Sequence, residues 1–271
     1  MTDRPVALVT GASSGIGFAI ASLLAARGYH TFGTSRSPQS DLGPKGVSMV
    51  QLDVRSDEST SSAMGEVLSR TGGIDILVNN AGYGLFGAIE ETSLDEARRQ
   101  LETNFWGAVR LTQHVLPRMR ERRSGRILNV TSVLGFMPVP FHAFYVASKH
   151  ALEGYSEALA LEVRPFGVFV SVIEPSFIRS AFFEHRQEAK TPLDAYKRER
   201  NLVSLQMRER TQNGSHPDVV ARVVMRAVAA SNPAVRYTVG LNGSMLKLAR
   251  SFSPSSLFDR LVRKSFGLDQ A

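Results

Sequence analysis

The sequence contains no cysteine, which excludes disulfides, thiol nucleophiles and thiolate metal sites. It has no apolar run long enough to cross a membrane, and the polar residues 1–5 lead into a short apolar run without a signal-peptide core. The six histidines lack the close histidine or carboxylate spacing of a metal site. We therefore expect a cytoplasmic protein with no transmembrane segment and no metal.

A nucleic-acid partner is not expected either, although the formal net charge is +7. Most basic residues are scattered, and one group of arginines stands where a predicted helix ends, without interleaved aromatic residues. A solvated helix terminus, favoured by the helix dipole, is therefore preferred over nucleic-acid binding. The group comprises Arg118, Arg120, Arg122, Arg123 and Arg126.

Short apolar runs alternate with amphipathic helical stretches along the chain. With 271 residues, 43% of them hydrophobic, the chain can bury one substantial core. The alternation predicts an α/β fold with a doubly wound parallel sheet and helices on both faces, and such sheets bind ligands at the carboxyl ends of their strands. The predicted strands are residues 6–10, 29–35, 47–54, 74–79, 126–132, 168–174 and 236–240.

A glycine-rich turn follows the first predicted strand and leads into an apolar helix. Its spacing, G-x-x-x-G-x-G, lets the backbone approach a pyrophosphate at the helix N-terminus, although a plain strand-to-helix turn has the same pattern. After the fourth predicted strand, an Asn-Asn-Ala-Gly segment is either a turn or a second contact with the nucleotide. The residues expected to bind the nucleotide are Gly11, Ser13, Ser14, Gly15, Ile16, Gly17, Asn80, Ala81 and Gly82.

Arg36 follows the second predicted strand, where a site selective for NAD carries an acidic residue. Without that carboxylate, and with a guanidinium able to clamp a phosphate, we expect NADP(H) as the cofactor. Arg36 could instead stack on the adenine or point to solvent. Asp53, which could bind the adenine edge, and its neighbour Val54 complete this part of the predicted site.

Tyr145 is followed four residues later by Lys149 and preceded by Ser132 at the end of an apolar run. On a helix spanning about 143–164, Lys149 lies on the face of Tyr145, where its charge would lower the pKa of the phenol from about 10. Ser132 would share the same substrate oxygen. The pattern predicts a proton-transfer site, whereas a Tyr-x-x-x-Lys pair alone is also typical of a helix surface.

Together with Asn104, these motifs resemble the short-chain dehydrogenase/reductase family in their order, over residues 5 to about 180. The resemblance implies a single Rossmann-like domain covering residues 1–271, with Tyr145 as general acid in carbonyl reduction and general base in alcohol oxidation. It implies that Ser132 polarises the substrate oxygen, that Lys149 binds the nicotinamide ribose, and that Asn104 holds a water. It also assigns to the cofactor Tyr145, Lys149, Pro175, Ile178 and Ser180, although Ser176 stands where the family often has glycine.

The substrate pocket is expected among apolar and aromatic residues after the fifth predicted strand and in a lid region at about 177–217. Such a pocket suits a small hydrophobic carbonyl or alcohol, and its residues resemble, more loosely, those of the hydroxysteroid and retinol dehydrogenases. Several of them could equally belong to the core. Residues 194–210 predict a mobile lid helix or, alternatively, an exposed charged helix. The predicted pocket residues are Leu134, Phe136, His142, Phe177 and Phe182.

A C-terminal helical extension at about 243–271 is predicted from Ser253 as N-cap and Pro254 as the first helical residue. Five basic residues there face only Asp259 and Asp269, so the helix could contact a membrane surface. Docking on its own domain or on a partner subunit is the preferred interpretation. The family resemblance implies a homodimer or homotetramer. The predicted apolar face comprises Leu257, Phe258, Leu261 and Val262.

Three functions are compatible with these patterns. The leading hypothesis is an NADPH-dependent oxidoreductase that interconverts a hydrophobic ketone or aldehyde and its alcohol. The alternative enzyme is a 3-oxoacyl-thioester reductase of lipid or polyketide metabolism, whose phosphopantetheine carrier would favour a basic entrance. The alternative outside enzymes is a non-catalytic NADPH-binding sensor or scaffold, which would have little reason to keep Asn104, Ser132, Tyr145 and Lys149 together.

Overall fold

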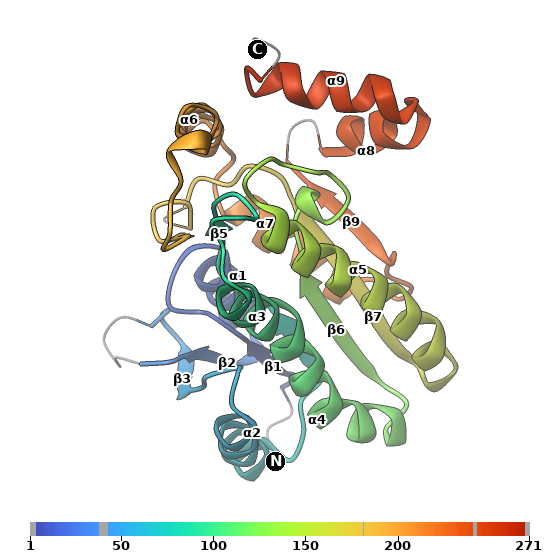
Figure 1. Ribbon diagram of the computed structural model, residues 1–271. Helices are drawn as coiled ribbons and strands as arrows, with labels where there is room; N and C mark the ends of the chain where they lie inside the picture. The colour runs from blue at the N-terminus through green and yellow to red at the C-terminus, as the bar shows by residue number, and fades with distance from the viewer. Residues whose placement is uncertain (1–3, 38–42, 181, 241–242, 269–271) are drawn as a thin grey trace.

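One parallel sheet organises the chain in a computed structural model that describes residues 4–37, 43–180, 182–240 and 243–268. Its seven strands lie in the order β3-β2-β1-β4-β6-β7-β9 (Figure 1), so the strand order reverses between β1 and β4. The predicted doubly wound α/β fold is confirmed. The strands are β1 (Val6–Val9), β2 (His30–Ser35), β3 (Val47–Gln51), β4 (Ile76–Asn79), β6 (Gly125–Val130), β7 (Val168–Pro175) and β9 (Arg236–Val239).

Each predicted strand corresponds to one strand of this sheet, although the third was predicted too long, because β3 ends at Gln51. Two further strands were not predicted: β5 (Leu85–Phe86) and β8 (Gln187–Glu188) pair in parallel as a separate sheet. Strands of two residues have no periodicity that a sequence could display.

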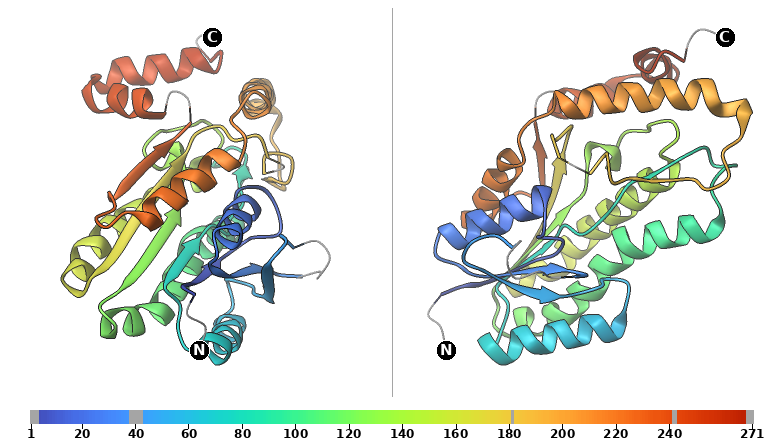
Figure 2. Two further views of the ribbon diagram at one scale, coloured as in Figure 1. Left: turned by 180° about the vertical axis from the view of Figure 1, so that it is seen from behind. Right: turned by 90° about the vertical axis from the view of Figure 1, so that its left-hand side faces the viewer.

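Helices cover both faces of the large sheet. α4 (Gly107–Glu121) and α5 (Ala143–Val163) lie on the face turned toward the viewer in Figure 1, together with α2 (Asp57–Thr71). α1 (Gly15–Ala26) and α7 (Asp218–Ala229) cover the opposite face, which is seen from behind in Figure 2. The core therefore consists of two apolar layers, one on each side of the sheet.

The remaining helical turns connect these layers. α3 (Leu94–Leu101) begins with a capping box, in which the Ser93 hydroxyl accepts from the Glu96 N–H and the Glu96 carboxylate accepts from the Ser93 N–H. A π-helical turn then joins α3 to α4, and three short 3₁₀ turns lie elsewhere. The π turn is η1 (Glu102–Trp106), and the 3₁₀ turns are η2 (Val133–Gly135), η3 (Arg164–Phe166) and η4 (Asp194–Tyr196).

Three helices gather at the upper end of the molecule in Figure 1: α6 (Lys197–Gln212), α8 (Gly243–Phe252) and α9 (Ser255–Ser265). η4 and α6 correspond to the predicted lid helix. An apolar cluster joins this end to the start of α5, because Phe258 and Val262 of α9 pack in the same cluster as Val203 of α6 and as Tyr145.

The C-terminal extension differs from its prediction in three respects. It forms two helices, and α9 begins at Ser255 with Pro254 as its N-cap, so Ser253 is not the cap. Only half of the predicted apolar face is buried: Phe258 and Val262 are covered, while Leu257 and Leu261 are exposed. Asp269 lies outside the described residues.

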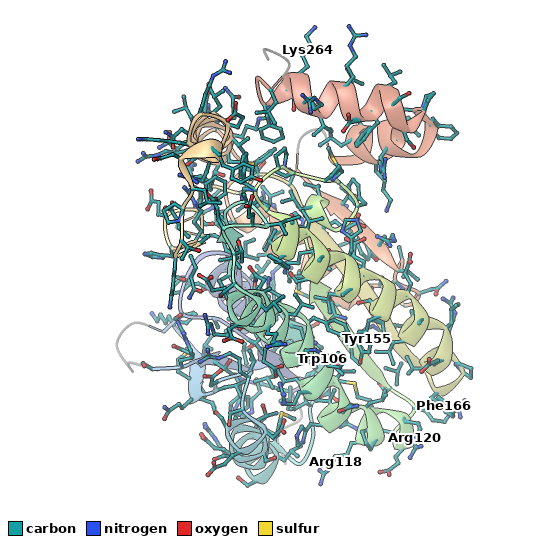
Figure 3. All side chains as sticks on the ribbon, viewed as in Figure 1. Trp106, Arg118, Arg120, Tyr155, Phe166 and Lys264 are labelled. Atoms are coloured by element: carbon teal, nitrogen blue, oxygen red, sulfur yellow. The ribbon has the colours of Figure 1, made fainter. Side chains whose placement is uncertain are left out.

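The arginine group at the end of α4 largely binds the chain's own backbone. Arg122 donates to the Ile74 carbonyl at 2.9 Å, and Arg123 donates to the Pro165 carbonyl at 2.8 Å. Arg118 donates to the Gly72 carbonyl, and Arg126 to the Ala230 carbonyl. The arginines thus connect the end of α4 to neighbouring loops, as predicted for a helix terminus. This region lies at the lower end of the molecule in Figure 3, where Arg118 and Arg120 are labelled.

Candidate active site

A cavity of about 500 Å³ opens at the carboxyl ends of the central strands, beside the point where strand order reverses. Its wall contains most of the predicted site residues, although they come from distant parts of the sequence. They are Gly11, Ser13, Ser14, Gly15, Ile16, Arg36, Asp53, Val54, Asn80, Ala81, Gly82, Ser132, Leu134, His142, Tyr145, Lys149, Pro175, Phe177, Ile178, Ser180 and Phe182.

The glycine-rich turn has the geometry of a cradle for a phosphate group. Gly11 and Gly15 have φ angles of 64° and 55°, which side chains disfavour. Gly17 lies beneath the turn rather than in the cavity wall, and a Cβ there would lie 2.2 Å from the Gly11 carbonyl oxygen. The Ser14 side chain makes no capping hydrogen bond to α1. The first N–H groups of that helix are therefore not occupied by this side chain and can bind a phosphate. These features fit the pyrophosphate of a dinucleotide.

The ends of β1 and β4 are joined by hydrogen bonds that also shape the turn. The Thr10 hydroxyl oxygen accepts from the N–H groups of Asn80 and Ala81, each at 2.9 Å. The Asn80 amide donates to the carbonyls of Thr10 at 2.9 Å and Gly11 at 3.2 Å. The predicted second contact segment therefore fixes the glycine turn while its own residues line the cavity.

Arg36 and Asp53 lie at the end of the cavity formed by β2 and β3. Arg36 is exposed, and none of the described residues 30–37, which form β2 and its end, is acidic. Asp53 accepts hydrogen bonds from the Arg55 guanidinium at 2.9 and 2.6 Å, and this contact lowers the pKa of its carboxyl. Arg55 also lines the cavity and was not predicted, although it stands only two residues beyond Asp53.

Ser132, Tyr145 and Lys149 converge in the middle of the cavity wall. Ser132 follows β6, and its hydroxyl accepts from the Leu134 N–H at 3.2 Å. Tyr145 and Lys149 lie on one face of α5, with the Lys149 Nζ 5.7 Å from the centre of the Tyr145 ring. Lys149 Nζ donates to the Val130 carbonyl at 3.0 Å, which ties the lysine to the end of β6.

The pKa of Tyr145 is shifted in the direction opposite to the one predicted. Burial raises it to about 12, and a hydrogen bond with Ser132 opposes this shift. Burial also lowers the pKa of Lys149 to about 8, and the nearby charge of Glu153 opposes that. The charge of Lys149 alone predicts a lower pKa for Tyr145, whereas loss of solvent is the largest influence on the pKa of both groups.

Asn104 does not line the main cavity. Its side-chain oxygen accepts from the Tyr83 N–H at 3.1 Å, and its amide donates to the Tyr83 carbonyl at 3.0 Å and to Ser148 at 3.1 Å. It lines a second cavity of about 10 Å³ next to Val130, the residue that accepts from Lys149. A space of this size is close to that of one water molecule.

The loop after β7 borders the same cavity through Pro175, Ile178 and Ser180. Ser176, which replaces the family's glycine, is accommodated by Gly240: a Cβ on Gly240 would lie 2.1 Å from the Ser176 hydroxyl oxygen. Gly240 has a φ of 102°, a conformation that also favours glycine. The absence of a side chain at Gly240, at the end of the neighbouring strand, therefore leaves room for the Ser176 hydroxyl.

The side of the cavity where the substrate was predicted to bind is aromatic. The rings of Phe182 and Tyr145 are 5.8 Å apart, and His142 packs on Phe86 at 5.0 Å. Burial lowers the pKa of His142 to about 4, so this histidine is neutral. Phe136 was predicted in this wall but is not part of it, because its ring packs near Lys247 instead.

Sequence reasoning missed Arg186, whose guanidinium lies 4.6 Å from the Phe86 ring and 3.9 Å from the Phe183 ring. Arg186 lines the cavity, and among the described residues its Nε has no hydrogen-bond partner. Its sequence signal is weak, because it lies in an irregular segment whose position depends on tertiary packing.

The segment over the cavity is anchored to the loop before α3. The buried Glu91 carboxylate accepts from the N–H groups of Ala88 and Leu193, each at 2.8 Å, and pairs with Arg200 of α6. Burial opposes ionisation, but these contacts together lower the pKa of Glu91. The ionised Glu91 carboxylate thus attaches the predicted lid through Leu193 and through Arg200 near the start of α6.

Residues 5–191 match the short chain dehydrogenase family, and the chain belongs to this family. It is therefore an oxidoreductase of the short-chain type, as the order of its motifs predicted. The match covers the sheet from β1 to β7 together with Ser132, Tyr145 and Lys149.

Individual relatives span nearly the whole chain. It is 38% identical to 3-ketodihydrosphingosine reductase of Bacteroides thetaiotaomicron, over 95% of this chain and 96% of the relative. It is 36% identical to retinol dehydrogenase 8 of Bos taurus, over 96% of this chain and 90% of the relative, which confirms the predicted likeness to that branch. The structure of actinorhodin polyketide ketoreductase with NADPH has a TM-score of 0.74 and 31% identity, covering 89% of this chain and 97% of that one.

Proposed function

We propose that this chain is an NADP(H)-dependent oxidoreductase that interconverts a hydrophobic ketone or aldehyde and its alcohol. The observation that carries the proposal is that Ser132, Tyr145 and the glycine-rich turn line one and the same cavity. A hydride donor held along that turn and a substrate oxygen between the two hydroxyls would share one enclosed space.

In reduction, Tyr145 donates its phenolic proton to the substrate oxygen, and the Ser132 hydroxyl donates a hydrogen bond to the same oxygen. NADPH supplies the hydride when it is bound. Because the pKa of Tyr145 is raised to about 12, the phenol is protonated near neutral pH and ready to act as an acid. Oxidation of an alcohol needs the phenolate, which the charge of Lys149 would stabilise.

Lys149 also offers a route for replacing the proton that Tyr145 gives up. Its pKa of about 8 makes it a proton donor near neutrality. Val130 accepts from Lys149 and borders the small cavity beside Asn104. We assign to Asn104 the holding of a water there, between the lysine and solvent.

NADP(H) is preferred over NAD(H) in this proposal because of Arg36. A guanidinium at the end of β2 can bind the ribose phosphate of NADP(H), and the carboxylate that would repel it is missing. The polyketide ketoreductase with a similar structure was solved with NADPH, which supports the same preference.

The proposed substrate class rests on the cavity wall and on the relatives. Leu134, Phe177 and Phe182 give the wall apolar surface near Tyr145. The two relatives are named for 3-ketodihydrosphingosine and retinol, both largely hydrocarbon molecules. The proposed lid at about 177–217 would cover such a substrate, since residues from it line the cavity.

A 3-oxoacyl-thioester reductase is the second candidate, and the positive charge at the cavity favours it. Arg99 and Arg186 both line the wall, where they would suit a phosphorylated carrier. The similarity to a polyketide ketoreductase supports the same candidate.

NADPH and NADH consumption should be measured with 3-ketodihydrosphingosine, retinal and a 3-oxoacyl thioester, with Tyr145→Phe in parallel. Turnover of the free carbonyl compounds by the wild type alone would support the leading proposal, and faster turnover of the thioester would support the second. Tight NADPH binding without any turnover across the panel would favour a sensor instead.

We also propose a homodimer or homotetramer assembled through α4 and α5. Leu161 of α5 is exposed, as are Trp106 of η1 just before α4 and Phe166 of η3 just after α5. Figure 3 labels Trp106 and Phe166 on this face. Light scattering of wild type and of Trp106→Ser/Leu161→Ser would test it. A wild type that is monomeric at all concentrations would contradict the proposal.

A further inference from the structure

The outer face of the C-terminal helices carries an apolar stripe. Met245, Leu248 and Phe252 of α8 are 71%, 62% and 80% exposed. Their spacing of three and four residues places them on one side of the helix. A stripe of large apolar side chains in water marks a surface that a partner covers.

The domain itself covers the other side of both helices. Lys247 of α8 reaches the buried Glu174 at 3.3 Å, and Arg250 lies 4.9 Å from the ring of Phe258. Phe258 and Val262 of α9 are buried in the cluster that contains Tyr145. Docking on the domain, the interpretation preferred from the sequence, therefore accounts for these inner residues and leaves the stripe uncovered.

Positive charge accompanies the exposed apolar residues on α9. Leu257 and Leu261 are each 48% exposed, and Arg260 and Lys264 lie on the same outer side of the helix by their spacing. Figure 3 shows Lys264 on the outer side of α9, away from the sheet. Within residues 243–268 the only acidic residue is Asp259, against five basic ones.

This combination selects one kind of occupant. A second copy of the chain, paired face to face, would bring one basic patch with Arg260 and Lys264 against the other. An anionic lipid surface instead supplies negative charge around an apolar layer that can receive Met245, Leu248 and Phe252. Charge and exposure thus favour a bilayer over self-association.

We propose that the outer face of α8 and α9 docks the protein on the surface of a membrane that contains anionic lipids. The helices lie in the plane of the interface and do not cross it, in keeping with their short length. Among the described residues no helix is long and apolar enough to span a bilayer. The inference does not depend on the proposed reductase activity, because it concerns a surface outside the active-site cavity.

The position of this surface would suit a lipophilic substrate. The inner residues Phe258 and Val262 belong to the same apolar cluster as Met207 and Phe183. Met207 and Phe183 also line the active-site cavity. Docking would therefore bring these cavity-lining residues, Met207 and Phe183, within about one helix diameter of the lipid.

The test is co-sedimentation of the full chain with vesicles of phosphatidylcholine, with and without phosphatidylglycerol, at low and high salt. We expect binding to the anionic vesicles that weakens with salt. Met245→Ser/Leu248→Ser/Phe252→Ser should lower the partition coefficient at least about tenfold, since three large apolar groups no longer enter the interface. Arg260→Gln/Lys264→Gln should reduce the dependence on phosphatidylglycerol and on salt.

The matched control is Ile89→Ser/Leu94→Ser, which removes two residues that are 67% and 68% exposed elsewhere on the surface. It should bind vesicles like the wild type. Circular dichroism and NADPH titration show whether each variant is folded, independently of vesicle binding. The proposal is overturned if the wild type ignores anionic vesicles, if the stripe variant binds as well as the wild type, or if the stripe variant only changes the oligomeric state.

Discussion

Replacing Lys149 with methionine should stabilise the protein near neutral pH while removing its activity. The lysine ammonium is buried, and burial lowers its pKa from 10.5 to about 8. At about 1.36 kcal/mol per pH unit, this fall means that the charged group costs roughly 3 kcal/mol of folding free energy. Methionine has a similar length without the charge, but it loses the charge-assisted hydrogen bond to the Val130 carbonyl, worth roughly 1.5–3 kcal/mol. The expected net gain is therefore small, at most about 1.5 kcal/mol.

The gain should depend on pH in a defined direction. Because the folded pKa of Lys149 lies below the unfolded one, the cost is fully present below about pH 8 and fades as the pH rises to 10.5. Above that pH both states carry a neutral amine, so the stabilisation by methionine should disappear.

Urea denaturation followed by circular dichroism at about pH 7 and about pH 10 measures both effects. Lys45→Met serves as the control, because Lys45 is exposed and its replacement should leave stability nearly unchanged. A Lys149→Met variant less stable than the wild type at neutral pH would refute the argument that burial of this charge costs stability.

Three further changes test other parts of the site. Arg36→Ala should reduce the preference for NADPH over NADH by roughly 1.5–3 kcal/mol in binding titrations, because a charge-assisted phosphate contact is lost; an unchanged preference would contradict the assignment. Gly17→Ala should weaken cofactor binding severely, since its methyl group would meet a backbone carbonyl at 2.2 Å; normal binding would show that the turn is not the phosphate cradle. Burial lowers the pKa of Lys149 and the charge of Glu153 opposes this, so Glu153→Gln should move the alkaline limb of the pH–kcat profile below about 8. An alkaline limb at the same pH as in the wild type would show that Glu153 does not influence the pKa of the group that transfers the proton.

The fold, and the position of the glycine-rich turn in the cavity wall, were predictable because strand ends carry local sequence signals. The glycine turn, Arg36 and Asn80 each follow an apolar run directly, and parallel strands bring such ends to one edge of the sheet. Ser132 and Tyr145 were predicted to lie near this edge by the same logic, since Ser132 follows β6 and Tyr145 lies in the first turn of α5.

The rest depends on tertiary packing that local patterns do not contain. Arg186 reaches the cavity from an irregular segment, and Phe136 is turned away from it toward Lys247. The pKa of Tyr145 rises because surrounding residues exclude water, although the adjacent lysine alone predicts a fall. The C-terminal helix starts later than predicted because Pro254 itself occupies the N-cap position.

The most direct test of the central claim compares Tyr145→Phe with the wild type in turnover and in NADPH binding. With any carbonyl compound that the wild type reduces, we expect kcat to fall by about 10²–10⁴-fold, the contribution typical of a positioned proton donor. NADPH should still bind within a few-fold of the wild-type Kd, because the glycine turn and Arg36 remain in place. A Tyr145→Phe variant that keeps wild-type kcat would contradict the assignment of Tyr145 as the proton donor.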